Sequence, residues 1–336
     1  MNKVSIKDIA QKAGVCIGTV SRVINNLDRV HPATRRKILE LIEETGYRPS
    51  AAGRSLVSGR TNSVLVVVHN IADPYCAAIS KVFSNRWHNL NYKMLLGDSN
   101  YSPELEREHL ARARDGSIDG LIVSPIPGHR NAAIYRKIAE SGFPFVAIDN
   151  RVENVKTNCV KYDDADAASL AVEHLAGKGH RHIAFIHSRP EFQTVKDRLA
   201  GYRKTIQQLR LPLLDEFQAP IPLVPAEASV SIRALMRRKP TPTALLVENE
   251  IMAMVCMNTL LQAGYKIPQD AAVIAIGDTL TEHFAPVPLT TVSLKHDLMC
   301  EKTVNLLKHF IDSPRSVKLT PVTEIIRPGL VIRASA

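Results

Sequence analysis

The sequence lacks any segment suited to crossing a membrane. In its 336 residues, no apolar run approaches the roughly 20 residues that a membrane-spanning helix needs. The N-terminus, MNKVSIKDIA, has none of the uninterrupted apolar stretch of a secretory signal. We therefore expect a cytoplasmic protein with no membrane partner.

Cysteine is also sparse. Five cysteines are scattered along the chain, at positions 16, 76, 159, 256 and 300, and none belongs to a CxxC pair. An odd number of widely spaced cysteines favours reduced thiols and argues against a disulfide framework or a zinc site. We predict no structural metal.

Catalytic motifs are missing as well. The sequence has no phosphate-cradling P-loop, no GxSxG nucleophile elbow and no His/Cys set at metal-binding spacing. Its 12 histidines are dispersed. These absences argue against an enzyme and give no reason to expect a cofactor.

Positive charge is concentrated at one end of the chain. Residues 1–60 hold 11 of the 43 Lys/Arg but only five of the 33 Asp/Glu, so most of the net charge of +10 lies in the first sixth. A basic terminal module on a nearly balanced body is typical of nucleic-acid binding. A solvated basic surface would have the same composition.

The basic segment has the pattern of three short helices. Ser5 and Asp8 have the spacing of a capping box, and an apolar stripe follows at positions 6, 9, 10 and 13. Gly14 supplies a tight turn before a second helix from about residue 17 to 25, and Pro32 can open a third that ends at Gly46. This pattern predicts a helix-turn-helix module.

The second helix carries a polar stripe opposite its valines. Gly18, Arg22 and Asn25 lie at i, i+4 and i+7, with Ser21 beside them. In a major groove, Arg can bind guanine and Asn can bind adenine through paired hydrogen bonds. An ordinary solvated helix face is the alternative, but the concentrated charge favours DNA binding.

The rest of the chain alternates short apolar runs with helical segments. Seven runs read as strands: VLVVVHN, KMLLGDSN, GLIVSP, FVAIDN, HIAFIHSR, ALLVENE and AVIAIGD. Continuous apolar strands separated by helices predict parallel sheets covered on both faces. Each run ends in polar residues, where open α/β sheets bind ligands. Helix capping alone is the alternative explanation for any one of these residues.

The chain resembles the lactose-repressor (LacI/GalR) family. The resemblance is carried by IKDIAQKAGVCIGTVSRVIN and TRRKILELIEETGYRPSAAGRSL, and by RTNSVLVVVHNIADPY, IDGLIVS, FVAIDN, GHRHIAFI, DRLAGYR, IPQDAAVIAIGD and PLTTV in family order. It implies an N-terminal all-α helix-turn-helix domain at 1–49, a hinge helix or linker at 50–61, and an α/β two-lobed periplasmic-binding-protein-like (type I) domain with parallel sheets at 62–336. The implied N-lobe spans about 62–160 and 293–323, and the implied C-lobe about 161–292 and 324–336.

The resemblance implies a set of DNA-contacting residues. Leu56 takes the position of a hinge-helix leucine that wedges into the minor groove, a contact that unstacks and bends the duplex. Cys16 replaces a usual Ser or Thr, and Ile17 and Gly18 stand where the family varies with operator sequence. The candidate DNA contacts are Ser5, Cys16, Ile17, Gly18, Thr19, Ser21, Arg22, Asn25, Arg29 and Leu56.

The resemblance also implies an effector site between the lobes. Asp149, Arg198 and Asn249 match positions that hold effector hydroxyls, with Asp73 and Tyr75 in the same cleft. Carboxylate, guanidinium and amide together suit polyol recognition. Asp278 completes the predicted set. For Arg198 alone, an ion pair with Asp197 or another acid is the alternative role.

Two departures from the family bear on the effector. In the segment GDT at 277–279, Gly277 stands at the position where the family carries the first of two acids. The segment APIPLVPA at 219–226 has no aromatic residue that could stack on a ligand. Arg189, His187 and His283 motivate the hypothesis of an anionic effector, a sugar phosphate or sugar acid. The segments LVVVHNIADPY and LLGDSN also resemble the cytidine-responsive regulators of the family, which keeps a nucleoside open.

We therefore expect a cytoplasmic transcriptional regulator, a repressor of a carbohydrate or related catabolic operon. It would bind a near-palindromic operator as a homodimer and respond to a small-molecule effector, either a sugar, sugar phosphate, sugar acid or nucleoside. The chain ends at LVIRASA without heptads, which predicts a dimer and no tetramer. The alternatives are a solute-binding protein for transport and a regulator whose ligand acts as co-repressor.

Overall fold

The computed structural model describes residues 4–24, 27–47, 59–128, 130–188, 191–222, 224–279, 285–313 and 320–336. The chain divides into two compact units, Met1–Thr61 and Asn62–Ala336. Within the described residues, no helix is long and apolar enough to span a membrane.

The first unit is a three-helix module. Its helices are α1 (Ile6–Ala13), α2 (Ile17–Ile24) and α3 (Pro32–Thr45). Ile9, Val20 and Ile38, one from each helix, are fully buried together. The helix-turn-helix predicted from the sequence is confirmed.

Local signals set the ends of these helices. The Ser5 hydroxyl accepts from the Asp8 N–H at 3.4 Å, and Asp8 Oδ2 accepts from the Ser5 N–H at 2.8 Å, which confirms the capping box. These hydrogen bonds to Ser5, backbone first, hold the pKa of Asp8 below its usual value. Gly14 ends α1 at φ 71°, a conformation that glycine adopts without strain.

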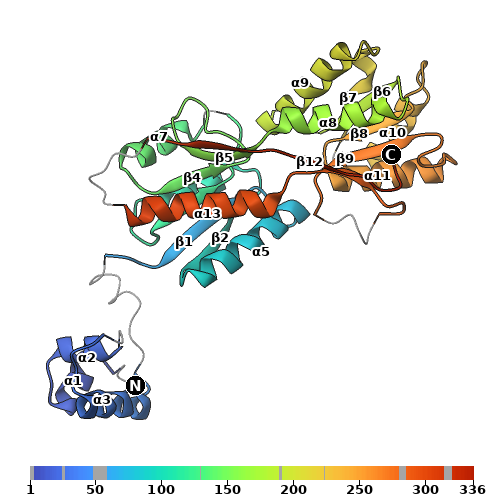
Figure 1. Cartoon of the computed structure of the whole chain (residues 1–336). Coiled ribbons are helices and arrows are strands. Elements are labelled where there is room, and N and C mark those ends of the chain that lie inside the picture. Colours follow the sequence, from blue (N-terminus) through green and yellow to red (C-terminus); the bar gives the residue numbers. More distant parts are fainter. Residues whose placement is uncertain are drawn as a thin grey trace. The chain divides into compact units, whose positions relative to one another are not determined.

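The second unit consists of two α/β lobes, each with a six-stranded sheet (Figure 1). The first sheet has the order β11-β5-β4-β3-β1-β2, with the following bounds: β1 (Ser63–Val68), β2 (Lys93–Asp98), β3 (Gly120–Val123), β4 (Phe145–Ile148), β5 (Asn158–Tyr162) and β11 (Thr323–Ile326). The second has the order β12-β10-β9-β8-β6-β7, with β6 (Ile183–His187), β7 (Gln218–Pro220), β8 (Ala244–Val247), β9 (Ala272–Ile276), β10 (Thr290–Ser293) and β12 (Gly329–Val331). All pairings are parallel except that of β12 with β10.

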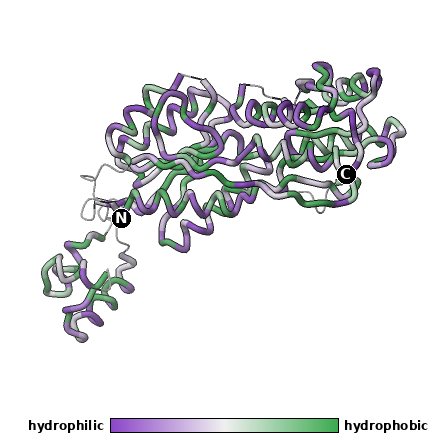
Figure 2. The backbone as a smooth tube through the Cα atoms, turned by 45° about the horizontal axis from the view of Figure 1, so that its top comes forward, coloured by the Kyte–Doolittle hydropathy of each residue, from purple (hydrophilic) through white to green (hydrophobic). Residues whose placement is uncertain are grey.

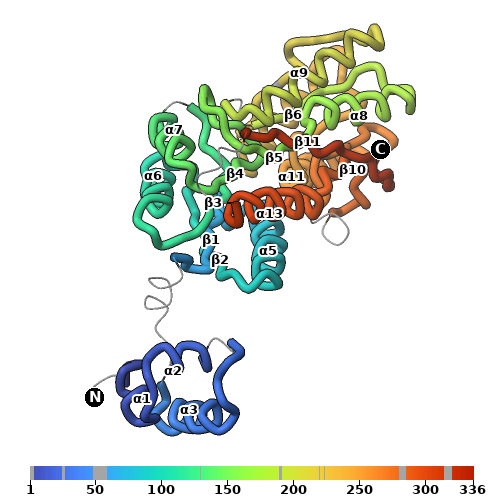
Figure 3. The backbone as a smooth tube through the Cα atoms, turned by 60° about the vertical axis from the view of Figure 1, so that its left-hand side comes forward, coloured from blue at the N-terminus to red at the C-terminus, as the bar shows by residue number. Residues whose placement is uncertain are grey.

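Helices cover both faces of each sheet (Figure 3). On the first lobe these are α5 (Pro74–Asn89) and α13 (His296–Asp312) on one face, and α6 (Pro103–Ala111) and α7 (Ala132–Glu140) on the other. On the second lobe they are α8 (Asp164–Gly177) and α9 (Gln193–Gln208), and α10 (Pro225–Met236) and α11 (Glu250–Gln262), with a short 3₁₀ turn at Asp215–Phe217.

Alternation along the strands explains why both faces must be covered. In β1, Val64, Val66 and Val68 pack on the α5/α13 side, whereas Leu65 and Val67 pack on the α6/α7 side. Successive side chains of a strand point to opposite faces, so a continuous apolar run needs two helix layers. Hydrophobic residues are accordingly concentrated along the strands, with hydrophilic residues on the outer helices (Figure 2). The predicted parallel α/β architecture is confirmed.

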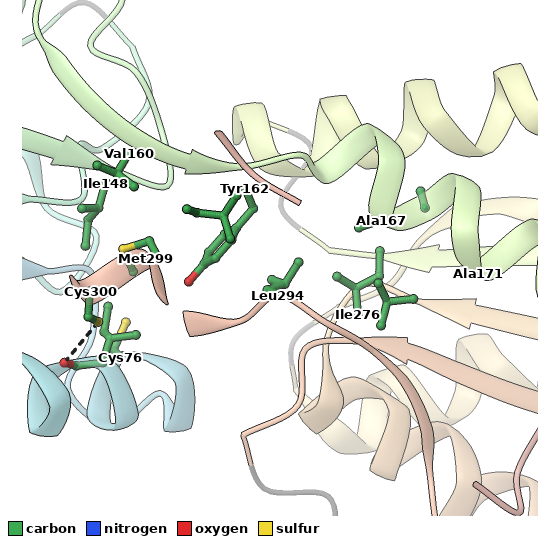
Figure 4. Close-up of a cluster of buried hydrophobic side chains, with 14 of the residues drawn as sticks. Cys76, Ile148, Val160, Tyr162, Ala167, Ala171, Ile276, Leu294, Met299 and Cys300 are labelled. Atoms are coloured by element: carbon green, nitrogen blue, oxygen red, sulfur yellow. Dashed lines mark hydrogen bonds between the residues drawn. The ribbon is translucent and has the colours of Figure 1, made fainter. Parts of the chain in front are cut away.

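The chain passes between the lobes three times. The crossings follow β5, follow β10, and lie between β11 and β12. Buried side chains continue across this region: Ile148, Val160 and Met299 lie on one side of Tyr162 and Leu294, and Ile276 and Ala167 on the other (Figure 4). The two lobes therefore share one apolar cluster at the crossings.

Helices α8 and α9 approach closely because of one glycine. A Cβ atom at Gly201 would lie 2.1 Å from the Ala165 carbonyl oxygen, which no side chain can do. The contact fixes α9 against α8 and thereby places Arg198, one turn earlier on α9, above the end of the lobe's sheet.

Candidate functional site

A cavity of about 560 Å³ lies at the carboxyl ends of the strands of the second unit. Its wall includes residues of both lobes, such as Tyr75 and Asp149 from the first and Arg198 and Asn249 from the second. This is the place where open α/β sheets bind ligands. Five of the six predicted effector residues line it: Asp73, Tyr75, Asp149, Arg198 and Asn249.

On the first lobe, Asp149 is the centre of a hydrogen-bond network. It follows β4 with φ 62°, accepts from the Tyr75 hydroxyl at 2.5 Å and accepts from Ser124 Oγ at 3.1 Å. The Tyr75 and Tyr162 hydroxyls are 3.1 Å apart. Burial raises the pKa of Asp149 from 3.8 to about 6, against the opposing effect of the Tyr75 hydrogen bond.

On the second lobe, Arg198 both lines the cavity and forms a buried ion pair. Its Nε donates to Asp164 Oδ1 at 2.8 Å, and its Nη1 donates to the Glu248 carbonyl at 2.6 Å. The Asp164 side chain has no exposed surface. The two roles considered for Arg198 therefore coexist, with Asp164 as its partner; Asp197 pairs with Lys161 instead, at 2.7 Å.

Two of the predicted residues also cap helices. Asp73 Oδ1 accepts from the Tyr75 N–H at 2.9 Å at the start of α5, and Asn249 Oδ1 accepts from the Met252 N–H at 2.8 Å at the start of α11. A cap uses only one side-chain oxygen. Both residues also line the cavity, so capping and ligand contact are compatible.

Asp278 differs from its prediction as an effector contact. It is absent from the cavity wall, and its Oδ1 accepts from Thr291 Oγ1 at 3.0 Å and from Arg333 Nη2 at 3.1 Å. The side chain ties the end of β9 to β10 and to the C-terminal segment. An ion pair with a residue 55 positions away is invisible in the local sequence.

Two glutamates were missed as candidates. Glu248 and Glu250 flank Asn249 after β8, line the cavity and are buried, at 4% and 5% exposure. Gly277 is explained by Glu250: a Cβ atom at 277 would lie 3.0 Å from Glu250 Oε1. The carboxylate of α11 thus occupies the space next to the position where the family carries an acid. In the sequence, the polar residues at the end of the run ALLVENE were the only indication that Glu248 and Glu250 could belong to the site.

The cavity also contains aromatic rings that the sequence pattern did not predict. Phe192 meets His69 edge-on at 5.1 Å between centroids, and Tyr101 at 6.0 Å. His69 and Tyr101 stack at 5.5 Å with 11° between their planes. These rings come from both lobes, whereas the sequence search for an aromatic covered only 219–226.

The anionic-effector hypothesis gains no support from His187. This side chain is buried, is absent from the cavity wall, and has a pKa lowered by burial. Arg189 and His283 lie outside the described residues. The cavity wall that is described is rich in carboxylates.

On the first unit, the predicted DNA-contact residues gather on and around α2. Cys16, Ile17, Gly18 and Arg22 are exposed, while Thr19 and Ser21 are partly exposed; Val20 and Val23 are buried on the opposite side. The exposed side of α2 therefore presents one cation, small residues and one apolar side chain, which suits a groove-reading helix.

The remaining predicted contacts flank this helix. Cys16 Sγ lies 3.3 Å from Thr19 Oγ1, and hydrogen bonds to Thr19 hold the pKa of the thiol below its usual value. Ser5 is exposed but its hydroxyl caps α1, and Arg29 is exposed with φ 73°. Asn25, Leu56 and most of the predicted hinge (50–58) lie outside the described residues.

Comparison with known proteins finds a family model for part of each unit. Residues 5–50 match "Bacterial regulatory proteins, lacI family", and residues 172–336 match "Periplasmic binding protein-like domain". The HTH-type transcriptional regulator DegA of Bacillus subtilis is 28% identical over 87% of this chain and 86% of DegA. The HTH-type transcriptional repressor PurR of Mannheimia succiniciproducens is 28% identical over 98% of each chain.

Solved structures give the same result. The complex of the transcriptional regulator CelR with cellobiose has a TM-score of 0.73 at 25% identity, covering 99% of this chain and 100% of CelR. The Lac repressor bound to ONPG in the repressed state has a TM-score of 0.86 at 22% identity, covering 100% of both chains, and shows the same fold.

A basic helix-turn-helix unit followed by a two-lobed unit with a central cavity defines a ligand-binding transcriptional regulator. Residues 5–50 carry a domain of the lacI family of bacterial regulatory proteins and residues 172–336 a periplasmic-binding-protein-like domain, the combination that the sequence predicts. Among the described residues, no group of three or more His, Cys, Asp or Glu is placed to hold a metal ion.

The raised pKa of Asp149 makes stability depend on pH. The folded state holds a proton that an unfolded aspartate releases, so Asp149 lowers the free energy of unfolding as the pH rises from about 4 to about 6, with no further change above that. Asp149→Asn removes this titration, and urea unfolding across that window should show a shallower fall than in the wild type. Equal slopes in both proteins would contradict this role.

Proposed function

We propose that the protein is a cytoplasmic transcriptional repressor that binds a near-palindromic operator as a homodimer and is controlled by a small molecule in the interlobe cavity. The proposed division is DNA binding by 1–49, a hinge at 50–61, and effector binding and dimerisation by 62–336. One combination supports this proposal: an exposed groove-reading face on α2 in the same chain as a cavity lined from two lobes.

Contacts between the two lobes suggest how ligand affinity and DNA affinity would be coupled. Lys161 on β5 pairs with Asp197 on α9, and Phe192 meets His69 and Tyr101. A ligand that favours these contacts favours one arrangement of the lobes. If operator binding also favours one arrangement, the two sites share a coupling free energy of typically 1–3 kcal/mol.

The relatives support the direction of this proposal. PurR is named a repressor, CelR is described in complex with cellobiose, and a related Lac repressor structure is described as a dimer bound to operator. A transport solute-binding protein would need no DNA-binding unit, and residues 5–50 match the regulatory family. We propose that the protein has no catalytic activity.

Selection of bound duplexes from a random DNA library tests the DNA-binding proposal directly. We expect enrichment of a two-fold symmetric sequence, because a symmetric dimer presents two copies of α2 to two half-sites. Adding candidate ligands to the protein on the selected duplex then shows whether the effector releases DNA or strengthens binding. Failure to enrich any sequence would refute the proposal.

Sedimentation velocity tests the oligomeric state. We expect a homodimer, because a two-fold symmetric operator offers two half-sites to two copies of α2. A stable tetramer, or a monomer at concentrations that saturate the operator, would contradict this expectation.

A further inference from the structure

The described wall of the cavity carries more negative than positive side chains. Asp149, Glu248 and Glu250 are all buried in it, together with the partly buried Asp73. Arg198 is the single Lys or Arg among the described lining residues. The described wall is therefore acidic, and charge interactions are strong for carboxylates that are buried.

Arg198 does not balance these acids. Its guanidinium is already held by Asp164, a fully buried carboxylate outside the cavity wall, and by the Glu248 carbonyl. Burial lowers the pKa of Arg198, but Asp164, Glu248 and Asp149 together more than offset this effect and raise it. The single positive charge of Arg198 therefore interacts with three neighbouring carboxylates, those of Asp164, Glu248 and Asp149.

Glu248 provides the most specific sign of a missing partner. Its Oε1 accepts from Ser188 Oγ and, at 3.2 Å, from Asn249 Nδ2. Its Oε2 is buried and has no hydrogen-bond partner among the described residues. A buried carboxylate oxygen without a donor is costly, and the residue lines a cavity large enough for a ligand.

A positively charged donor satisfies this site better than a hydroxyl. A hydroxyl group supplies the missing hydrogen bond but leaves the excess negative charge in place. An ammonium group supplies the bond and the charge together, and charge-assisted hydrogen bonds are about twice as strong as neutral ones. The same wall contains the aromatic residues Tyr75, Tyr162 and Phe192, whose rings can attract a cation.

Other groups in the wall suit hydroxyls. Arg198 and Asn249 line the cavity and carry N–H groups beyond those that donate to Asp164 and Glu248, and Asp149 is an acceptor. We therefore propose, on the basis of the effector cavity assigned above, that the effector is a hydroxylated amine whose ammonium group binds Glu248 and whose hydroxyls bind Arg198, Asn249 and Asp149. Amino sugars and amino polyols have this chemistry.

Matched amine and neutral compounds test this proposal on the full-length protein. Glucosamine with glucose, galactosamine with galactose, and mannosamine with mannose differ in one amine. Tris with pentaerythritol is a smaller pair that differs by an ammonium group in place of a hydroxymethyl group. Thermal shift in an amine-free buffer below neutral pH ranks them, because ligands stabilise by mass action.

We expect at least one amine to bind roughly tenfold or more tightly than its neutral partner, the effect of a charged hydrogen bond. Glu248→Gln keeps the shape of the side chain and should remove that preference, so that the amine and its neutral partner bind the variant with similar affinity. Glu324→Gln is the control: it changes net charge equally, on β11, outside the cavity wall.

The outcomes separate the two proposals. If no amine is preferred over its neutral partner in the wild type, the inference is wrong, whether or not Glu248→Gln folds. If the neutral compounds bind and no amine is preferred, the proposal of a positively charged effector is wrong. The assignment of the cavity as the effector site is then still supported. An amine preference that survives Glu248→Gln would overturn the assignment to Glu248.

Discussion

Replacing Arg198 with alanine is expected to lower the free energy of unfolding of the second unit by about 3–5 kcal/mol and to abolish the response to effector. The loss arises because Asp164, whose side chain has no exposed surface, keeps a charge without a partner. The Glu248 carbonyl loses its donor as well. Urea unfolding measures the first effect, and effector titration of the operator complex measures the second.

A double variant separates the ion pair from the effector contact. In Arg198→Met with Asp164→Asn, both charges are gone, so stability should recover most of the loss, since replacing both members of a buried pair is often nearly neutral. The effector response should stay absent. A loss below about 1 kcal/mol in Arg198→Ala would show that the pair is solvated.

Replacing Arg22 with alanine is expected to weaken operator binding by about 1–3 kcal/mol, if Arg22 binds a guanine edge. Arg22 is exposed on α2, opposite the buried Val20 and Val23, so its removal should leave the fold intact. Fluorescence anisotropy on the selected operator and on variants of its half-sites measures affinity and sequence preference together.

Arg36→Ala is the matched control, because Arg36 is exposed on α3 and its loss changes charge equally. It should weaken binding to all sequences by a similar amount, as loss of a phosphate contact does. Arg22→Ala should instead relax preference at one position of each half-site. If both variants weakened binding to all sequences equally, Arg22 would not contribute to base recognition.

Seven strands could be read directly from the sequence because each contains a continuous apolar run. Six of them are buried between two helix layers, and β2 lies at the edge of its sheet and is only partly buried. The structure adds β5, β7, β10, β11 and β12, none of which was read as a run. β5, NCVKY, carries polar residues because it lies next to a crossing between the lobes. β12 pairs antiparallel with β10 after the last crossing, a reversal that no local pattern encodes.

The effector site was only partly readable for a similar reason. Asp73, Asp149 and Asn249 follow strands or begin helices, so strand ends and the family pattern locate them. Glu248 and Glu250 stood in the same polar ending, but the need for a ligand donor emerges only from Ser188 and the unpartnered Oε2. Asp278 pairs with Arg333 from the far end of the chain, a contact that the local sequence does not reveal.

The sequence by itself determined the helix-turn-helix and the parallel α/β body, because helix capping, apolar periodicity and charge segregation are local properties. The order of its motifs carried the resemblance to the lactose-repressor family. The tertiary structure decided which polar side chains face the cavity and which serve the fold. Burial and pairing depend on residues distant in sequence, such as Asp164 with Arg198 and Gly277 with Glu250. The charge of the cavity, and with it the proposed chemistry of the effector, exists only once the chain has folded.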